Sequence, residues 1–136
     1  NKVMYKMLTA ISALMTECNN RVYGPPLGIP TGMTAPDKAV IFENDGGPGH
    51  PDIPMADERF AFYCYGASQP EATAVFDTLF DALHRKGFTQ VAYATGVTAL
   101  VRRIELDMGP VDMPDPGNNW PRVVSAWRML YKEAAV

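Results

Sequence analysis

The sequence predicts an α+β domain in which an antiparallel sheet of about four strands carries two helices on one face. Two segments repeat apolar side chains at helical spacing, and four others have the alternation typical of strands. Successive strands are joined without helices, which favours antiparallel hairpins, so the expected order is helix, strand, strand, helix, strand, strand. At 136 residues, the whole chain (1–136) is expected to form a single domain.

The first helix is predicted over residues 3–18 and is expected to end near Asn19. Its apolar stripe consists of Met4, Met7, Leu8, Ile11, Leu14, Met15 and Cys18. Val22 and Tyr23 could then form a short extended segment that pairs with another strand. Residues 38–43 (KAVIFE) are predicted to form one strand, and residues 59–65 (RFAFYCY), whose side chains alternate toward two faces, a second.

The second helix follows the strand 59–65 directly and carries its own capping signals. Gly66 ends the strand, Ser68 can cap the helix, Pro70 lies in its first turn and Glu71 completes a capping box. The apolar stripe that follows is Ala72, Val75, Phe76, Leu79, Phe80 and Leu83. The basic stretch 84–86 favours the negative end of the helix dipole, and Gly87 suits the left-handed position after it.

Two more strands are predicted over residues 97–108 and 123–131, while residues 88–94 read as either a short strand or an extended connection. Strict alternation along 97–108 would put one set of side chains on a common face: Leu100, Arg102, Ile104, Leu106 and Met108. Arg102 and Arg103 would then point to opposite faces of the sheet, so that one of them faces the covered side or a partner.

Composition and charge narrow the classes of function. The net charge of −3 argues against a protein whose main task is to grip nucleic acid. No apolar run reaches the ~18–20 residues of a membrane span, and the first residues lack the pattern of a signal peptide, so neither a membrane partner nor a leader is expected. Cys18 and Cys64 each lie in an apolar pattern and are expected to be buried free thiols, with a disulfide as the alternative.

Few side chains suggest chemistry. Asp45, His50 and Asp52 share a glycine-rich loop, but their spacing matches no common metal cage, and a solvated loop is the expected alternative. The glycines form neither a dinucleotide fingerprint nor a phosphate-binding loop. His84 has a structural reason to lie at a helix C-terminus. We therefore expect no catalytic residues, no metal and no cofactor.

Polar contacts and long loops point instead to assembly. The predicted strand 97–108 carries Arg102, Arg103, Glu105 and Asp107, and together with Arg122 its alternating charges suit a polar subunit interface, although local ion pairs on a solvated sheet would look the same. Trp120, between a loop and a strand, could be either a lid on the core or an interface anchor. Eleven of the twelve prolines lie in three loops of a dozen residues or more, which is uncommon unless such loops are used.

These marks together resemble the tail-terminator (tail-completion) proteins of long-tailed bacteriophages and related tail-like particles. The matching motifs, in order, are the opening helix with Arg21-Val22-Tyr23-Gly24 and its proline-rich loop, Lys38-Ala39-Val40-Ile41-Phe42, Phe62-Tyr63-Cys64-Tyr65-Gly66 running into Ser68, Glu71 and Ala72, Gly109-Pro110, and Asp115-Pro116 with Trp120-Pro121 before a strand. Each motif is short, and the resemblance rests on their order over nearly the whole chain.

The resemblance implies a structural virion protein rather than an enzyme. Such proteins form hexameric rings that cap the head-proximal end of the tail tube, stop its polymerisation and join it to the head connector. The implied partners are further copies of the chain, the tail tube protein and the head–tail connector protein, with DNA only passing through the channel. Assembly would take place in the host cytoplasm.

The resemblance also suggests roles for the charged residues. Arg102, Arg103, Glu105 and Asp107, with Arg122 and Trp120, would form subunit contacts or line the channel, where carboxylates repel DNA phosphates. The loops 44–57 and 109–121 would reach toward the tube or the connector, presenting Asp45, His50, Asp52, Asp112 and Asp115. Two alternatives stay open: another head–tail connector component, and a small ferredoxin-like ligand-binding or enzymatic domain.

Overall fold

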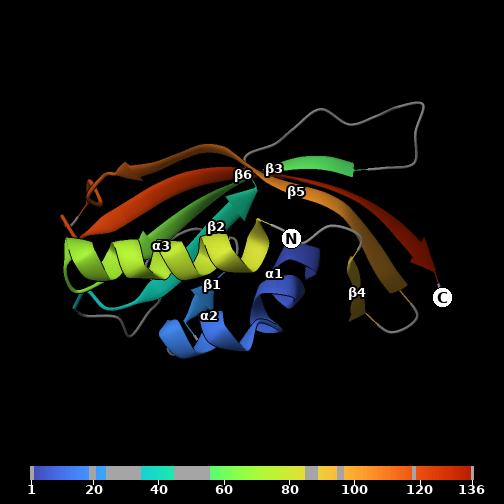
Figure 1. Cartoon of the computed structure of the whole chain (residues 1–136), viewed down its shortest axis with the longest axis horizontal. Helices are drawn as coiled ribbons and strands as arrows, with labels where there is room; N and C mark the ends of the chain where they lie inside the picture. Colours follow the sequence, from blue (N-terminus) through green and yellow to red (C-terminus); the bar gives the residue numbers. More distant parts are fainter. Residues whose placement is uncertain are drawn as a thin grey trace.

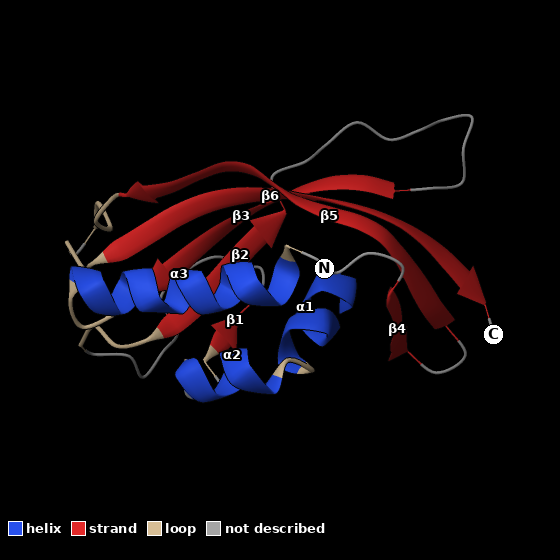
Figure 2. Cartoon of the chain, viewed as in Figure 1, coloured by secondary structure: helices blue, strands red, loops and turns tan. Residues whose placement is uncertain are grey.

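The computed structural model describes residues 2–18, 21–23, 35–44, 56–84, 89–94, 97–117 and 119–135. A six-stranded sheet in the order β1-β2-β3-β6-β5-β4 carries the helices on one of its faces (Figures 1 and 2). The elements are α1 (Lys2–Thr9), α2 (Ser12–Glu17), β1 (Val22–Tyr23), β2 (Ala39–Asn44), β3 (Ala56–Tyr65), α3 (Gln69–Leu83), β4 (Thr89–Ala94), β5 (Val97–Asp112) and β6 (Arg122–Ala135). The predicted α+β class is confirmed.

The number and order of elements differ from the prediction. Both segments with an uncertain assignment, 22–23 and 89–94, are strands, so the sheet has six strands instead of about four. The helix predicted over residues 3–18 is two helices, because the backbone becomes extended at Ile11 (φ −92°, ψ 101°). The hydroxyl of Thr9 donates to the carbonyl of Tyr5 at 3.0 Å as the first helix ends. The predicted apolar stripe is still largely buried, since both helices turn it toward the core.

The antiparallel pair β3–β6 forms the middle of the sheet. Its register sets Phe60 opposite Trp127 and Phe62 opposite Ser125. All four side chains are fully buried under the helices, and the Trp127 indole donates to the Ser125 hydroxyl at 3.2 Å, which satisfies both buried polar groups. The alternation predicted for residues 59–65 therefore separates a helix-covered face from an open face.

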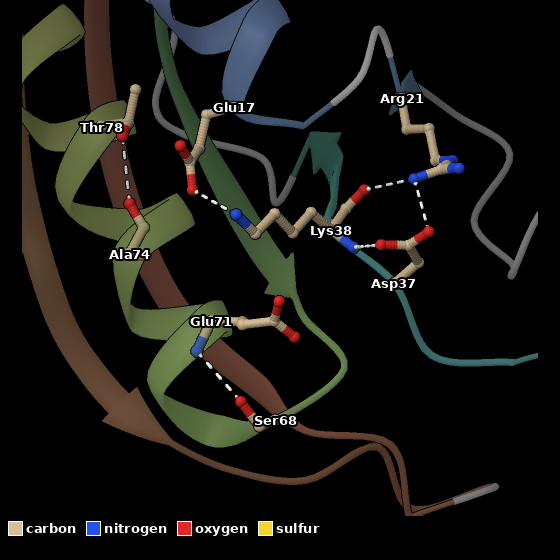
Figure 3. Close-up of polar contacts among 8 residues, drawn as sticks. All are labelled: Glu17, Arg21, Asp37, Lys38, Ser68, Glu71, Ala74 and Thr78. Carbon is tan, nitrogen blue, oxygen red and sulfur yellow. Dashed lines mark hydrogen bonds and ion pairs between the residues drawn. The ribbon is translucent and has the colours of Figure 1, made fainter.

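The helix α3 begins as the capping signals predict. The Ser68 hydroxyl accepts a hydrogen bond from the Glu71 amide at 3.4 Å, and Pro70 lies in the first turn (Figure 3). The buried stripe of this helix contacts the sheet, with the ring centroids of Phe80 and Trp127 5.9 Å apart. His84 caps the other end, while Gly87 lies outside the described residues.

The N-terminal segment is joined to the sheet by β1, which runs parallel to β2, and by two ion pairs. The Lys38 ammonium lies 3.0 Å from the Glu17 carboxylate, and Arg21 lies 2.9 Å from Asp37 (Figure 3). Arg21 also donates to the carbonyl of Lys38 at 3.4 Å. Polar contacts thus align α2, β1 and the start of β2, although exposed pairs of this kind contribute little each.

Bulges along β5 overturn the face assignment predicted for residues 97–108. The pairing with β6 shifts register between Val101 and Arg103, so Val101 and Ile104 both point into the core. Arg102 lies at this shift and Arg103 follows it, and both are exposed. Neither arginine therefore faces the covered side, because an extra residue at a bulge breaks the period-two alternation, and a contact of either one with a partner stays a prediction.

Both cysteines are free and buried, as predicted. Burial raises the pKa of the Cys64 thiol, and the neighbouring Cys18 adds to the increase. A high pKa keeps the Cys64 thiol protonated and unreactive, so this side chain behaves as a small apolar core residue.

Replacing Leu79 with alanine should lower the free energy of unfolding by about 2–5 kcal/mol, because the fully buried side chain would leave a cavity between α3 and the sheet. Urea unfolding monitored by tryptophan fluorescence measures the change. Asp81→Ala, at an exposed position of the same helix, is the control and should stay within about 0.5 kcal/mol. Equal effects of the two substitutions would contradict the assigned packing of α3.

Candidate assembly interface

The face of the sheet opposite the helices is the main candidate surface. Ala61, Val124 and Ala126 point to this face from β3 and β6 and are buried, although no described helix covers them. In the register, Ala61 lies opposite Ala126, and Val124 lies opposite Tyr63. Larger neighbouring side chains therefore shield these small ones from water. The centre of the open face is therefore closely packed.

Charged side chains form a row across three strands of this face. Glu105 on β5 lies opposite Arg128 on β6, which lies opposite Arg59 on β3. Arg59 also reaches Asp107 at 3.2 Å, and Arg103 lies 2.8 Å from Glu105. Three predicted interface residues of β5, Arg103, Glu105 and Asp107, are thus paired within one subunit, while a large part of each side chain stays exposed. Exposed pairs contribute little to stability, so they are free to exchange partners in an assembly.

The loop between β5 and β6 is organised by the carboxylate of Asp115. It accepts hydrogen bonds from the Tyr65 hydroxyl at 2.6 Å and from the Gly117 amide at 2.8 Å. The Arg122 guanidinium lies 4.0 Å away. The backbone amide of Asp115 donates to the Trp120 carbonyl at 3.0 Å. Asp115 therefore folds its own loop instead of presenting a free charge.

Arg122 is used inside the subunit as well. Only 9% of the residue is exposed, its Nε donates to the carbonyl of Met113 at 3.0 Å, and its guanidinium lies 4.7 Å from the centre of the Tyr63 ring. Trp120 packs edge-on against Tyr65, with 6.5 Å between ring centroids. Both residues thus have contacts within the subunit. Whether Trp120 is a lid on the core or an interface anchor, and what either residue does between subunits, stay predictions.

The residues predicted to face the tube or the connector are placed unevenly. Asp112 is exposed at the end of β5, whereas Asp115 points inward as described above. Asp45, His50 and Asp52 lie outside the described residues. Their assignment to the tube or connector stays a prediction.

Sequence reasoning missed an exposed apolar tip. Met108, Val111 and Met113 are 46%, 39% and 48% exposed, and Tyr5 on α1 is the other exposed large hydrophobic side chain in the described part of the chain. The sequence did carry a signal for this tip, because three large apolar residues lie within the six positions 108–113, where the proline-rich loop begins. Gly109 allows this segment to lie close against β6. Its φ is +106°, and a Cβ atom added there would lie 2.8 Å from the Val124 carbonyl oxygen, so the position has no room for a side chain.

Other kinds of site find little support among the described residues. Within those ranges, no group of three or more His, Cys, Asp or Glu side chains is arranged to hold a metal ion. The described helices include none that is long and apolar enough to cross a membrane. The surfaces that remain are those on the open sheet face and at the end of β5.

Comparison with known proteins identifies the fold. No protein-family model and no curated protein sequence matches the chain. Among solved structures, the chain is similar to a chain in the virion of a native gene transfer agent particle, with a TM-score of 0.68 and 16% sequence identity over 95% of this chain and 91% of that one. At this identity the similarity establishes a shared fold over nearly the full length of both chains.

Asp115→Ala should lower the free energy of unfolding by about 1–3 kcal/mol, since it leaves the Tyr65 hydroxyl and the nearly buried Arg122 without their carboxylate partner. Urea unfolding measures the loss. The matched control is Asp77→Ala on the exposed side of α3, which removes a carboxylate without a described partner and should change little. A neutral Asp115→Ala would show that the carboxylate does not organise the loop.

Stability should fall in alkaline solution because of Tyr65. Burial, followed by the hydrogen bond to Asp115, raises the pKa of Tyr65 from 10.0 to about 12. Because the pKa is higher in the folded state, the protonated Tyr65 hydroxyl stabilises the fold. This contribution to the free energy of unfolding is complete below pH 10 and is lost as the pH rises toward 12. Urea unfolding across this range should show a smaller decline for Tyr65→Phe than for Tyr5→Phe. The same decline in both variants would contradict the assignment to Tyr65.

Proposed function

We propose that the protein is a structural component of a phage-like virion and that copies of it close into a ring at the head-proximal end of the tail tube. The observation that carries the proposal is the shared fold, over 95% of the chain, with a chain of a gene transfer agent virion. The ordered motifs that resemble tail-terminator proteins support the more specific role. In this role the ring ends tube polymerisation and forms the joint with the head connector, and no step needs a catalytic residue.

The open sheet face suits such an assembly. Helices cover one face, while the other presents closely packed small residues crossed by exposed charges. A ring uses two different patches on every subunit, so contacts are heterologous and close only when the rotation between copies is right. We assign Arg102, Arg103, Glu105 and Asp107 to subunit contacts or to the channel wall, with hexameric closure as the expected state.

In the channel wall, the carboxylates of Glu105 and Asp107 would also keep DNA from binding to the ring. DNA that passes through must not adhere, and carboxylates repel phosphates over about a Debye length, ~8–10 Å at physiological salt. The tail tube protein and the head–tail connector protein would bind the two ends of the ring. The alternative role is that of another head–tail connector component, and the fold shared with a chain of a gene transfer agent virion is compatible with that role as well.

The direct test is size-exclusion chromatography with light scattering, combined with negative-stain imaging and antibody labelling of purified particles. Rings in solution, or label at the head-proximal tail end, would support the proposal. Label at the head vertex alone would indicate the connector alternative. A protein that is monomeric at every concentration and absent from particles would contradict both.

Reversing Glu105 and Asp107 to lysine should reduce DNA delivery by assembled particles about tenfold, because cations in the channel would hold phosphates. Delivery is measured in a particle-producing strain that carries only the variant. The control reverses Asp77 and Asp81, two exposed residues of α3, which adds the same charge on the helix that covers the other face of the sheet, and urea unfolding checks that both variants are folded. Unchanged assembly and delivery would remove these carboxylates from the channel.

A further inference from the structure

The first bulge of β5 turns two adjacent arginines away from the core. The pairing with β6 shifts register between Val101 and Arg103, and Val101 and Ile104 are both buried in the core. The two residues between them, Arg102 and Arg103, are both exposed. Strict alternation would send one of the two arginines toward the helices. A bulge re-aims side chains in this way, so it is the bulge that places two guanidinium groups next to each other on the surface.

A third cation lies on the neighbouring strand. Lys132 of β6 is exposed and lies opposite Leu100, one position beyond the pair formed by Val101 and Tyr131. Because Tyr131 is buried in the core, alternation turns Lys132 to the open face. Diagonal neighbours on paired strands lie about 7–8 Å apart, which long basic side chains can span. We define the basic cluster as Arg102, Arg103 and Lys132.

The charge of the basic cluster is only partly neutralised within the subunit. Arg103 lies 2.8 Å from Glu105, but 68% of the Arg103 side chain is exposed. Arg102 and Lys132 form no ion pair with another residue in the parts of the chain that the structure describes. Like charges gathered on one surface repel one another and destabilise the isolated subunit. In a chain of net charge −3, this local excess of positive charge indicates a contact surface for an anionic partner.

The carboxylates farther along β5 decide between two kinds of anion. Glu105 and Asp107 follow the basic cluster and pair with arginines of the open face. Duplex DNA carries one charge about every 1.7 Å, so a duplex bound to the cluster would also lie near these carboxylates and be repelled by them. A short acidic segment of a protein can reach the cations and end before the carboxylates. The arrangement therefore favours protein carboxylates over DNA phosphates.

The spacing of the cations indicates the form of the partner segment. Alternate residues of an extended strand point to the same side and lie about 7 Å apart, close to the spacing of diagonal neighbours on paired strands. Two carboxylates at alternate positions can therefore each reach a cation of the basic cluster. A guanidinium binds a carboxylate through two parallel hydrogen bonds, whereas the lysine ammonium acts as a compact charge.

We propose that the basic cluster binds an acidic segment of a neighbouring protein, an extended stretch with Asp or Glu at alternate positions. In this contact Arg102 and Lys132 gain the carboxylate partners that they lack within the subunit. Arg103 exchanges its exposed pair with Glu105 for a partner carboxylate. That the neighbour is another virion protein rests on the proposed function, whereas the contact itself does not. Glu105 and Asp107 remain available for the channel wall.

Binding of a synthetic peptide tests the contact. The probe is a fluorescent, β-forming peptide with two glutamates at alternate positions, and its anisotropy is measured with the whole chain at low salt. The double variant Arg102→Ala/Lys132→Ala should weaken binding about tenfold, because two charge pairs are lost. Lys6→Ala is the matched control, since Lys6 is an exposed cation of α1 that forms no ion pair in the described ranges. It should leave the affinity unchanged, and a peptide with glutamines instead of glutamates should not bind.

Charge exchange provides an independent measurement. Arg102→Glu/Lys132→Glu should lose the acidic peptide and bind a peptide that carries lysines at the same two positions. Urea unfolding checks that every variant is folded. A folded reversal variant that does not bind the lysine peptide would contradict a direct contact of these two side chains with the probe.

The other outcomes also decide the matter. A folded wild-type chain that does not bind the acidic peptide, or an equal loss in Lys6→Ala, would overturn the site. Tighter binding of duplex DNA, lost in Arg102→Ala/Lys132→Ala, would assign the cluster to nucleic acid. Self-association in light scattering that the same variant abolishes would make a second copy the occupant. Absence of the chain from particles would defeat the proposed function and leave peptide binding standing.

Discussion

The antiparallel pairing of β3 with β6 is the interaction on which the other parts of the structure depend. It sets Phe60 beside Trp127 and Phe62 beside Ser125 under the helices, and the sheet continues from it on both sides, through β2 and β1 next to β3 and through β5 and β4 next to β6. The helix α3 packs where these aromatic side chains are largest, through Phe80 against Trp127. The same register sends the alternate residues to the open face. One strand pair thus defines both the hydrophobic core and the surface available for assembly.

The open face is stable without a second layer because its packing is of a different kind. Small residues occupy the centre of this face. Longer side chains pack around them, and the Arg122 guanidinium lies over the Tyr63 ring. Asp115 and Arg122 hold the loop between β5 and β6 through contacts that are largely removed from water. The charged row on β5 differs from this network, since its pairs are exposed and weak. The loop held by Asp115 and Arg122 and the weakly paired charges on β5 therefore belong to the same part of the chain, an arrangement that suits a subunit that must assemble.

Prediction from sequence succeeded where local signals agree and failed where pairing partners decide. The cap at Ser68, the stripe of α3 and the burial of Cys18 and Cys64 depend on neighbours a few residues away. The break at Ile11, the bulge at Arg102 and the strand 89–94 depend on where the chain meets the sheet. A bulge leaves no composition signal, so the faces of Arg102 and Arg103 could not be derived from alternation. The inward turn of Asp115 was equally hidden, because Tyr65 is fifty positions away.

The sequence alone determined the α+β class, the main strands and helices, the buried thiols and the absence of a recognisable catalytic motif, since these follow from periodicity, capping and spacing within short windows. Only the tertiary structure decided which side chains share a face, which charges are already paired and which apolar residues remain exposed at the end of β5. The reason is physical. Burial and ion pairing are properties of residues that approach one another in space, and the register and bulges of a sheet, rather than its composition, determine which residues meet.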